Sequence, residues 1–409
     1  MLILSCNVGS TSLKYRLYRL GDREEELALG HFEGVGRERG SSDHRAAGGA
    51  QAASDAAAPD YATAIGQMLD FLAKSGALSP GVMPGCVAFK VVAALGYTGV
   101  QRLTEEVLGG MEALYALLPA HNPPYVAAIR QFAQVMPGVP LVGSFETGFF
   151  QQMPPEAYLY PLPAELSAHG LRRCGAHGAS HEYVSGWVAA REGRDDLRLI
   201  SCHLGGSSSM AAVRDGRGVD TTIGLSMQTG LPHNNRIGDI DPYITFYLHE
   251  SLGYSLDTIK DIYARQSGLL GLSGGVSADM REIAAAAQGG NSQAAIAIDA
   301  FCYQIKKHIG AFAAALGGLD AVAFTGGIGQ RSALVREKAL HGLDFLGIRL
   351  DAAKNADSPR DSLISAADSP VRVYIVATNE EIVIARKAKR LLEDEMGYTI
   401  GGSEHADQA

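Results

Sequence analysis

Two stretches of this 409-residue chain repeat one another about half the chain apart. Residues 4–12, LSCNVGSTS, align with residues 200–208, ISCHLGGSS, at an offset of 202 − 6 = 196 positions. The matched pairs are Ser5 with Ser201, Gly9 with Gly205, and Ser12 with Ser208. Each copy is an apolar strand followed by a turn of small residues, which predicts a duplicated α/β domain with a ligand between the copies. Chance similarity over nine residues is the alternative.

The length agrees with two domains, because 409 residues exceed the size of one ordinary hydrophobic core. The formal net charge of −9 argues against a general binder of nucleic acid or of anionic membranes, since both need a basic surface. No uninterrupted apolar run has the length of a membrane span. The first ten residues lack the basic leader and the long apolar run of a secretion signal, and we expect a cytoplasmic protein.

The five cysteines are far apart and never form a CxxC pair. This spacing suggests neither a zinc cluster nor a disulfide framework, and it favours a reducing compartment. We expect all five thiols to pack in the core.

The N-terminus predicts a β-hairpin. Residues 2–6 are apolar, residues 7–12 form a polar turn, and Leu13, Tyr15 and Leu17 then alternate with polar residues. The chain has no GxxxxGK motif followed by Ser or Thr, so a phosphate bound here would be held by a hairpin. By contrast, residues 36–60 show no periodicity and are expected to be a mobile surface loop.

The periodicity elsewhere alternates between helix and strand. Helices are expected at 61–74, 104–118, 126–135, 242–252, 255–265, 293–316 and 380–393, and strands at 85–92, 140–142, 321–324 and 371–376. Turns of Gly and Ser follow three of the apolar strands, at 7–12, 205–209 and 325–329. The last of these, TGGIG, could alone be an ordinary tight turn. Together the three turns supply many backbone donors from separate loops, which is what a triphosphate requires, and they point to ATP.

The motifs together resemble the acetate kinase family, within the actin-like, ribonuclease H-like superfamily of two-domain phosphotransferases. The matching segments occur in the family's order across nearly the whole chain. They are NVGSTSLKY (7–15), HNP (121–123), FET (145–147), GAHGASH (175–181), HLGGSSS (203–209), RIGDIDP (236–242), SGLLGLSGGVSADMR (267–281), FTGGIGQRSALVRE (324–337) and TNEE (378–381).

The resemblance implies an α/β fold of two duplicated ribonuclease H-like domains with the active-site cleft between them. We expect residues 1–147 plus 382–409 to form the acyl-side domain and residues 148–381 the nucleotide-binding domain. It also implies a homodimer and small-molecule partners, a carboxylate or an acyl phosphate, with no nucleic acid or membrane partner.

Carried over by motif position, the resemblance implies sites for ATP and Mg²⁺. Asn7 and Glu380 match positions that arrange Mg²⁺ and the phosphates, as suits a hard cation with few protein ligands. The nucleotide residues implied are Asn7, Ser10, Ser12 and Lys14 in the first turn, His203, Gly205, Gly206 and Ser207 in the second, Asp279 and Arg281 on the adenosine side, and Gly326, Gly327, Ile328, Gly329 and Gln330 in the third.

For the transfer step, Arg236 matches the arginine that stabilises the in-line transition state, and His177 matches a histidine that hydrogen-bonds the moving phosphoryl group. A planar guanidinium and a neutral donor suit charge spread over equatorial oxygens. The simpler interpretations are a surface ion pair for Arg236 and a hydrogen-bonded core histidine for His177. Lys90 and Glu146 complete the expected catalytic set.

Two catalytic positions depart from the family pattern. Lys90 stands where the family has an arginine, and one ammonium cannot reproduce a bidentate fork. Glu146 replaces the aspartate of the family's FDT motif, which keeps the charge and moves it outward by one methylene. We therefore expect altered geometry near the reacting phosphorus.

The expected acyl pocket departs as well. By motif position it comprises Val92, Ala120, His121, Ala176 and Met227, in which alanines replace a leucine and a phenylalanine, and Met227 replaces a proline. The two alanines remove ~150 Å³ if nothing refills the space, which predicts a larger substrate. The flexible Met227 could instead refill part of the space. His121 could be only a helix-terminal residue fixed by the neighbouring prolines.

These observations predict an ATP- and magnesium-dependent kinase that converts a carboxylate to an acyl phosphate by direct in-line transfer. The alternative is a catalytically impaired relative that binds nucleotide and has a regulatory role, because the departures cluster on the acyl side.

Overall fold

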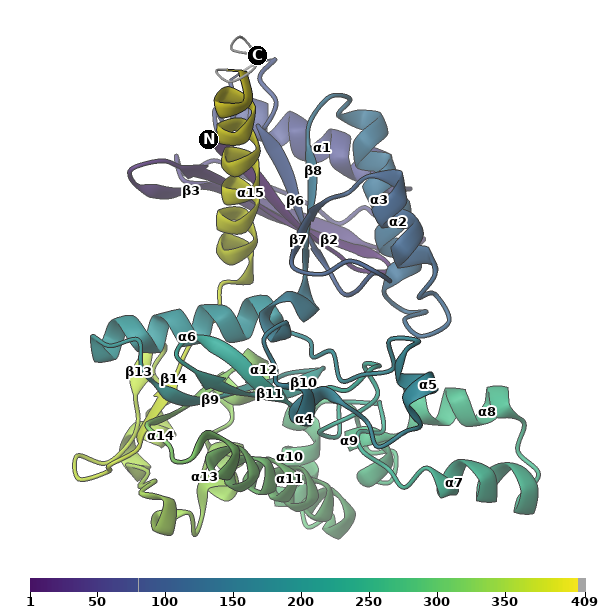
Figure 1. The fold of residues 1–409 in the computed structure, drawn as a ribbon, viewed down its shortest axis with the longest axis vertical. Helices are drawn as coiled ribbons and strands as arrows, with labels where there is room; N and C mark the ends of the chain where they lie inside the picture. The colour runs from purple at the N-terminus through teal and green to yellow at the C-terminus, as the bar shows by residue number, and fades with distance from the viewer. Residues whose placement is uncertain (80, 404–409) are drawn as a thin grey trace. The chain divides into compact units, whose positions relative to one another are not determined.

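The computed structural model describes residues 1–79 and 81–403 of the chain. It divides into two compact units, Met1–Gly148 with the segment from Asn379 onward, and Phe149–Thr378. Each holds one mixed sheet with helices on both faces (Figure 1). Among the described residues no helix is both long and apolar enough to cross a membrane.

The first unit contains an eight-stranded sheet in the order β5-β4-β3-β2-β1-β6-β8-β7. The strands are β1 (Leu2–Val8), β2 (Ser12–Leu20), β3 (Glu24–Glu33), β4 (Ser41–Ala46), β5 (Gln51–Ser54), β6 (Cys86–Val91), β7 (Val100–Arg102) and β8 (Leu141–Phe145). The predicted hairpin is present: β1 pairs antiparallel with β2, and parallel with β6.

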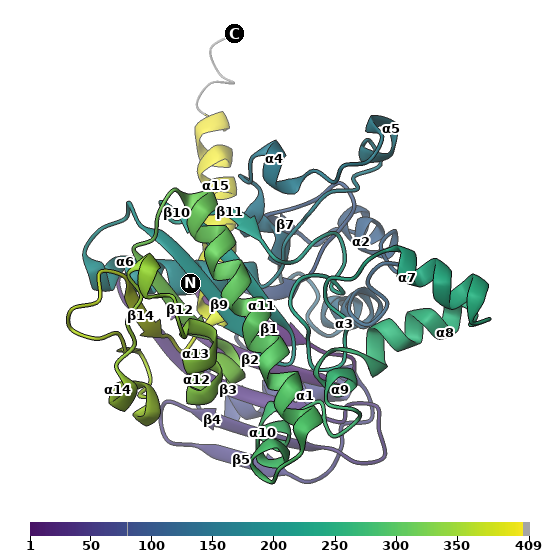
Figure 2. The same ribbon diagram turned by 90° about the horizontal axis from the view of Figure 1, so that it is seen from below.

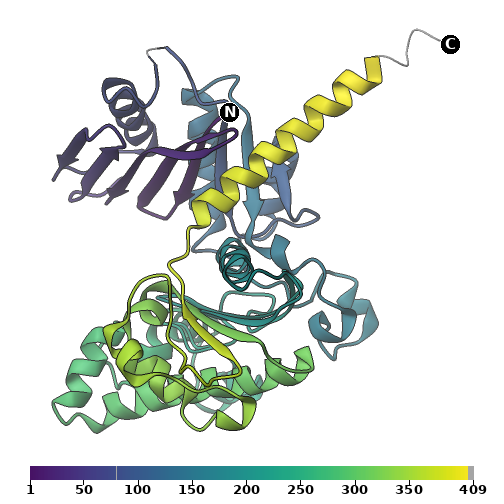
Figure 3. The same ribbon diagram turned by 90° about the vertical axis from the view of Figure 1, so that its left-hand side faces the viewer.

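Helices cover both faces of this sheet, because the central strand β1 is buried on both sides from Ile3 to Cys6. Helices α1 (Tyr61–Lys74) and α3 (Asn122–Val135) lie on one face, with α2 (Glu105–Glu112) against α3, and α15 (Glu380–Ser403) lies on the other (Figure 3). Because α15 packs on β1, β2, β6 and β8, its first residue Glu380 belongs to this unit. We expected Gly148 and residues 379–381 in the other domain, and residues 404–409 of the expected range lie outside the described residues.

The second unit contains a six-stranded sheet in the order β11-β10-β9-β12-β14-β13. The strands are β9 (Arg198–Leu204), β10 (Ser208–Arg214), β11 (Arg217–Thr221), β12 (Ala321–Thr325), β13 (Ser362–Leu363) and β14 (Arg372–Ile375). Its order β11-β10-β9-β12-β14 has the same strand directions as β3-β2-β1-β6-β8 of the first sheet. The expected fold class, α/β with a duplicated domain, is confirmed.

Alternation along β9 sorts the core of the second unit into two layers. Ile200, Cys202 and Leu204 pack with α11 (Ser292–Leu316), and Leu199 packs with α6 (Gly178–Glu192). Figure 2 shows α11 running across the sheet, with α10 (Met280–Gln288) and α13 (Ala333–Leu340) beside it.

The remaining helices connect these layers or lie at the periphery. They are the 3₁₀ helices η1 (Glu146–Phe150) and η4 (Asp344–Leu346), the π-helices η2 (Tyr247–Ser251) and η3 (Ile262–Gln266), and α4 (Pro155–Tyr158), α5 (Ala164–Ser167), α7 (Tyr243–Phe246), α8 (Leu256–Asp261), α9 (Gly268–Leu272), α12 (Gly326–Arg331) and α14 (Ala352–Asp357).

The expected loop at residues 36–60 was wrong, because β4 and β5 lie within it. The buried positions of β4 are Ser42 and His44, which are polar, so a hydrophobic alternation is invisible in the sequence. His44 is 5% exposed, its Nδ1 lies 2.9 Å from the hydroxyl of Tyr15, and its ring packs against Phe32 and Phe71. Burial lowers the pKa of His44, so the ring packs as a neutral group.

Candidate active site

The first predicted turn is a braced hairpin in the first unit. The amide of Gly9 donates to the carbonyl of Ser12 at 2.7 Å, and the hydroxyl of Tyr61 donates to the carbonyl of Gly9 at 2.6 Å. A Cβ at position 9 would lie 2.4 Å from the Ser12 hydroxyl oxygen, so a larger residue there would force the Ser12 side chain to move. Asn7 pairs with Lys14 across the two strands, and the side chains of Ser10 and Lys14 are exposed. The hairpin therefore carries all four residues expected for the first phosphate turn.

Lys90, at the end of β6, lies between two carboxylates. Its ammonium is 2.5 Å from Glu380 and 3.7 Å from Glu146. Only 14% of the Lys90 side chain is exposed, with 3% of Glu146 and 13% of Glu380. Burial disfavours the ammonium, but Glu146 and Glu380 favour it more strongly and raise the pKa of Lys90. The cluster therefore holds one positive and two negative groups. Glu146 is longer than the expected aspartate and Lys90 is shorter than the expected arginine, and the two side chains remain in contact.

The oxygen ligands of this cluster fit a divalent cation. Glu380 and Glu146 have carboxylates, and Asn7, which follows the Cys6–Phe89 pair of β1 and β6, has an amide oxygen. These are the ligands that Mg²⁺ uses sparingly alongside substrate phosphates and water. Two carboxylates against one ammonium leave a net negative charge that a cation would neutralise. The residues present are therefore compatible with Mg²⁺.

The acyl-side residues of the first unit follow β6 and begin α3. Val92 is buried, His121 is half-buried, and Ala120 is exposed. The sequence interpretation did not single out Asn122, which is fully buried and donates to the carbonyls of Ala93 at 3.0 Å and Met111 at 2.8 Å. Asn122 thereby connects α3 to the segment that follows Val92. The HNP motif was the available signal, but only its histidine had an assigned role.

In the second unit, His177 and His203 lie face to face. The alternation of β9 points His203 toward α6, and His177 precedes that helix in the left-handed conformation, at φ 55°. Their rings stack at 4.2 Å between centroids and 16° between planes. Nδ1 of His177 lies 2.7 Å from the Ser209 hydroxyl oxygen, and Nδ1 of His203 lies 2.8 Å from that of Ser180. The structure thus brings a predicted catalytic histidine to the start of the second turn.

Arg236 reaches the same turn. Its guanidinium donates to the carbonyl of Met227 and to the hydroxyl of Ser207, both at 2.6 Å. Among the described residues no carboxylate forms an ion pair with Arg236, and burial lowers the pKa of its guanidinium to about 10, so the group remains charged at neutral pH. The surface ion pair considered for Arg236 is therefore not its structural role. A partly buried cation without an acidic partner is suited to an anion.

His233 holds the segment before Arg236 in place, which sequence reasoning missed. Its Nδ1 accepts from the amide of Ser208 at 3.0 Å, and its Nε2 lies 3.3 Å from the carbonyl of Thr229. Burial first, and the neighbouring Arg236 second, lower the pKa of His233 to about 3, so the ring is neutral. A contact between His233 and the amide of Ser208 cannot be read from spacing in the sequence.

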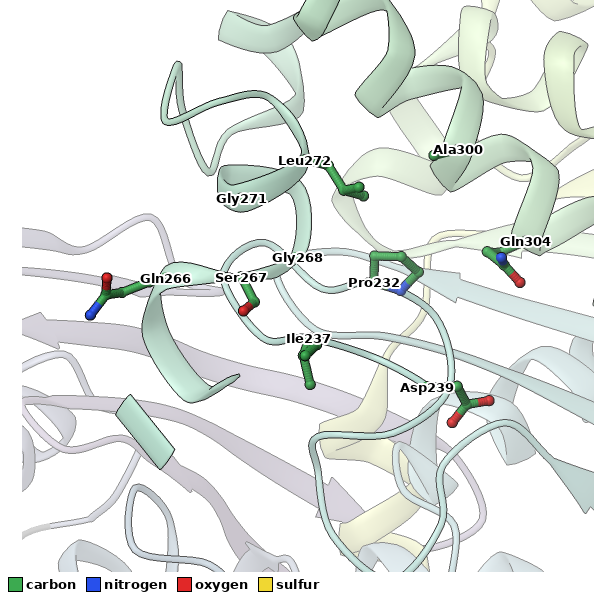
Figure 4. Close-up of a pocket in the computed structure, with 10 residues that line it drawn as sticks. All are labelled: Pro232, Ile237, Asp239, Gln266, Ser267, Gly268, Gly271, Leu272, Ala300 and Gln304. Carbon is green, nitrogen blue, oxygen red and sulfur yellow. The ribbon is translucent and has the colours of Figure 1, made fainter. Parts of the chain in front are cut away.

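Gly268 lets α9 approach this segment closely. It has φ +59°, and a Cβ there would lie 2.2 Å from the carbonyl oxygen of His233 and 2.6 Å from that of Arg236. Figure 4 shows Pro232, Ile237 and Gly268 around a cavity of about 360 Å³ beside the segment. The start of α9 thus packs against the backbone of Arg236, at a distance that only glycine permits.

The second and third turns lie together because β9 and β12 are adjacent and parallel, with His203 paired to Thr325. The third turn begins a short helix, α12, rather than forming a plain loop. A cavity of about 380 Å³ opens between them. Its lining residues are Gly205, Gly206, Asn234, Asp279, Met280, Arg281, Ala284, Gly327, Ile328, Arg331 and Ser332. Gly326, Gly329 and Gln330 lie in the same helix without lining the cavity.

Asp279 and Arg281 form the start of α10 at the edge of this cavity. Asp279 accepts from the amide of Arg281 at 2.8 Å and forms an ion pair with its guanidinium at 2.5 Å. These contacts, the side-chain pair above all, lower the pKa of Asp279 to about 2. The Arg281 side chain is 83% exposed.

A second missed residue, Arg336, supports α12 from inside. It is fully buried and donates to the carbonyls of Gly329 at 2.7 Å and Gln330 at 2.9 Å, and to the side chain of Asn355 at 2.7 Å. Burial lowers the pKa of Arg336 to about 10. Its place in the FTGGIGQRSALVRE motif was visible, but a buried arginine was not expected there.

The other two expected acyl-pocket residues lie in the second unit. Ala176 is 1% exposed and precedes His177 directly, and Met227 is 8% exposed and accepts from Arg236. The five cysteines are free thiols, four of them buried, and burial raises the pKa of each.

Comparisons with known proteins find similarity to acetate kinases over almost the whole chain. The model of the Acetokinase family matches residues 2–386. The chain is 39% identical over 397 residues to an acetate kinase of Clostridium botulinum strain Hall, covering 96% of this chain and 99% of the relative. It is 40% identical over 391 residues to an acetate kinase of Desulfitobacterium hafniense strain DCB-2, covering 94% and 98%.

Two solved structures are similar over almost the whole chain. The acetate kinase of Porphyromonas gingivalis superposes with a TM-score of 0.85 at 34% identity, covering 96% of this chain and 99% of that one. A propionate kinase from Francisella tularensis superposes with a TM-score of 0.86 at 33% identity, covering 94% and 98%.

The neutral state of His233 predicts a pH dependence of stability. Its folded-state pKa of about 3 lies below the ordinary value near 6.5. Its contribution is therefore complete above pH 6.5 and is lost as pH falls toward 3. Between pH 7.5 and 5 the free energy of unfolding should fall by about 2 kcal/mol more in the wild type than in His233→Asn, which retains an acceptor without titrating. Urea unfolding at several pH values measures the difference, and parallel pH curves would contradict the assignment.

Proposed function

The chain belongs to the Acetokinase family, whose members are phosphotransferases with a carboxyl group as acceptor, and we propose that it transfers the γ-phosphoryl group of ATP to a short-chain acid larger than, or different from, acetate. The transfer is reversible and gives an acyl phosphate directly, without a phosphorylated enzyme.

The observation that carries the proposal is the environment of Arg236. A partly buried guanidinium, paired with no carboxylate of the described residues, donates to Ser207 in the second turn. In phosphoryl transfer, charge develops on the equatorial oxygens, and a preorganised cation stabilises that charge without covalent chemistry. His177, stacked on His203 beside the same turn, supports a role as the hydrogen-bond donor to the moving group.

The nucleotide would occupy the cavity of about 380 Å³ in the second unit. Backbone amides of Gly205, Gly206 and Gly327 are available there for phosphate oxygens, with Asp279 and Arg281 toward the adenosine. In the first unit, Asn7, Ser10, Ser12 and Lys14 are the residues that we propose to bind phosphate. Asn7 and Glu380 would hold Mg²⁺, which supplies charge neutralisation on the phosphates when bound.

The acceptor assignment rests on the residues that depart from the family pattern. Small side chains at Ala120 and Ala176 and an unbranched one at Met227 support an acid longer than acetate. A propionate kinase is one of the similar solved structures, so the fold accommodates a longer acceptor. Lys90 would face the carboxylate as a single charge, its position set by Glu146 and Glu380.

A homodimer is part of the proposal. Tyr243, Phe246 and Tyr247 in α7 and η2 are 76%, 52% and 59% exposed. Leu252, Tyr254 and Leu256, which follow in the same segment, are exposed as well. We call these six side chains the apolar face, which a second copy of the chain would cover.

Acid-dependent ATP consumption tests the central proposal. In a hydroxamate assay with acetate, propionate, butyrate and a hydroxylated short acid, kcat/KM should be highest for an acid other than acetate. Arg236→Ala should lower kcat by about 10³-fold or more, as expected for loss of a cation at the transition state. The exposed Arg217→Ala is the matched control and should leave kcat unchanged.

Two results would contradict this proposal. Acetate used as efficiently as every longer acid would refute the enlarged pocket. No acid-dependent product from the wild type would favour the alternative, a nucleotide-binding relative with a regulatory role.

The pairing of Lys90 with Glu146 predicts coupled substitutions. Lys90→Arg lengthens the cation and Glu146→Asp shortens the carboxylate, so each alone should lower kcat/KM by about tenfold, because contacting residues couple. The double variant restores the family's pair and should come within about threefold of the wild type. Steady-state kinetics of the four proteins decides this, and independent, multiplying losses would show that the two residues do not compensate.

The dimer proposal predicts that sedimentation velocity gives twice the mass of the chain. Phe246→Glu places a charge on the apolar face and should shift the protein toward monomer, because an unpaired charge is costly to bury. The control is Glu165→Gln on α5, an exposed position outside the face. A wild type that sediments as a monomer would refute the assignment.

A further inference from the structure

A buried chain of hydrogen bonds ends at His177. His181 lies one turn into α6 and is fully buried, as are Ser201 on β9 and Ser209 on β10. Nδ1 of His181 is 2.9 Å from the Ser201 hydroxyl oxygen, and its Nε2 is 2.8 Å from that of Ser209. The Ser209 oxygen is in turn 2.7 Å from Nδ1 of His177. The order is therefore Ser201, His181, Ser209, His177.

Ser201, at the end of the chain opposite to His177, determines which partner donates in each of these hydrogen bonds. Among the described residues, His181 is the only hydrogen-bond partner of the Ser201 hydroxyl. A buried hydroxyl hydrogen without an acceptor is more costly than an unused lone pair, so Ser201 donates to Nδ1 of His181. Burial first, and His203 second, lower the pKa of His181 well below its ordinary value, which keeps the ring neutral. A neutral ring accepting at Nδ1 carries its single hydrogen on Nε2.

The remaining bonds follow in turn. The Nε2–H of His181 donates to the Ser209 oxygen, which leaves the single Ser209 hydrogen for Nδ1 of His177. We infer that Ser201, His181 and Ser209 are positioning residues that fix His177 in the tautomer with its hydrogen on Nε2. If all three hydrogen bonds ran in the opposite direction, His177 would carry its hydrogen on Nδ1 and a lone pair on Nε2.

The neighbouring histidine is arranged in the same way. Among the described residues, His203 is the only hydrogen-bond partner of the Ser180 hydroxyl, at 2.8 Å from Nδ1. The same reasoning places the hydrogen of His203 on Nε2, which faces the second turn, 3.9 Å from where a Cβ of Gly205 would lie. Two stacked rings thus both carry Nε2–H donors, which suits a phosphoryl oxygen and not a cation.

The inference deepens the proposed function and rests on it for its purpose, but the tautomer can be measured without turnover. The ¹⁵N chemical shifts of histidine-labelled resting enzyme distinguish protonated from unprotonated ring nitrogens, and His177→Gln assigns the signals of His177. The wild type should show Nε2 protonated and Nδ1 as an acceptor. Ser209→Ala should shift both His177 nitrogens toward a tautomer mixture.

Kinetics gives the second readout. Loss of the fixed tautomer should lower kcat by about 10- to 100-fold with KM for ATP changed less than about threefold, in the range seen when a group that orients a functional histidine is removed. Ser209→Thr keeps the hydroxyl and should restore kcat. His181→Gln keeps a donor near the ring Nε2 and should retain more activity than His181→Leu. Ser185→Ala, a buried serine on the same helix outside the chain, is the matched control.

Ser201→Ala, at the far end, provides a variant distant from His177 should Ser209→Ala fold poorly. It should also yield a tautomer mixture. A wild-type His177 protonated on Nδ1, or a tautomer unchanged in both serine variants, would overturn the inference. A wild type with the expected tautomer but no kinase activity on any acid would refute the proposed function and leave the inference supported.

Discussion

Burial of the second sheet on both faces is the constraint on which the site depends. Because α11 covers one face of β9 and α6 the other, successive side chains of that strand enter different layers. The layer beneath α11 is apolar, with Ile200, Cys202 and Leu204. The layer beneath α6 is apolar at Leu199 and becomes polar at Ser201 and His203 as the strand approaches its end. A single period-two pattern therefore both builds the core and places His203 at the start of the second turn.

The polar layer is stable only because its groups pair with one another. His181, Ser201 and Ser209 are fully buried, and their hydrogen bonds replace the water they lose. His233 and Arg336 act similarly on the neighbouring segments, holding the amide of Ser208 and the carbonyls that end α12. Much of the buried polar chemistry in the second unit therefore supports the backbone of turns. A preorganised turn needs little rearrangement when a phosphate binds.

In the first unit, three largely buried side chains are charged and form ion pairs. Lys90, Glu146 and Glu380 come from β6, the end of β8 and the start of α15, and the ion pairs bring distant segments of the chain to one point. The two catalytic positions that depart from the expected family pattern, Lys90 and Glu146, both lie in this cluster, and the two changes act in opposite directions on side-chain length. A shorter cation with a longer carboxylate preserves the contact while exchanging a planar fork for a single ammonium. The cation at position 90 thus has a different shape, while the balance of charges in the cluster is kept.

Much of the architecture was predictable because it follows from local patterns in the sequence. The repeat at Cys6 and Cys202, the alternation after Leu13 and the glycine turns predicted the hairpins, the duplication and the three glycine turns for which we propose phosphate binding. Prediction failed where a buried position is polar. Strand β4 was missed because its buried side chains, Ser42 and His44, are polar, so the strand has no hydrophobic alternation in its sequence. It also failed for Arg336 and His233, whose roles exist only through contacts with distant backbone.

The sequence by itself determined the fold class, the family and the residue types available at each turn, since periodicity, glycine positions and motif order are local properties. Only the tertiary structure decided which groups touch. It assigned Glu380 to the unit of Lys90, paired Arg236 with Ser207 rather than with an acid, and joined His177 to Ser201 through two intermediates. The physical reason is that hydrogen bonds and ion pairs depend on distance in space, and strand pairing sets those distances between residues that are far apart in the chain.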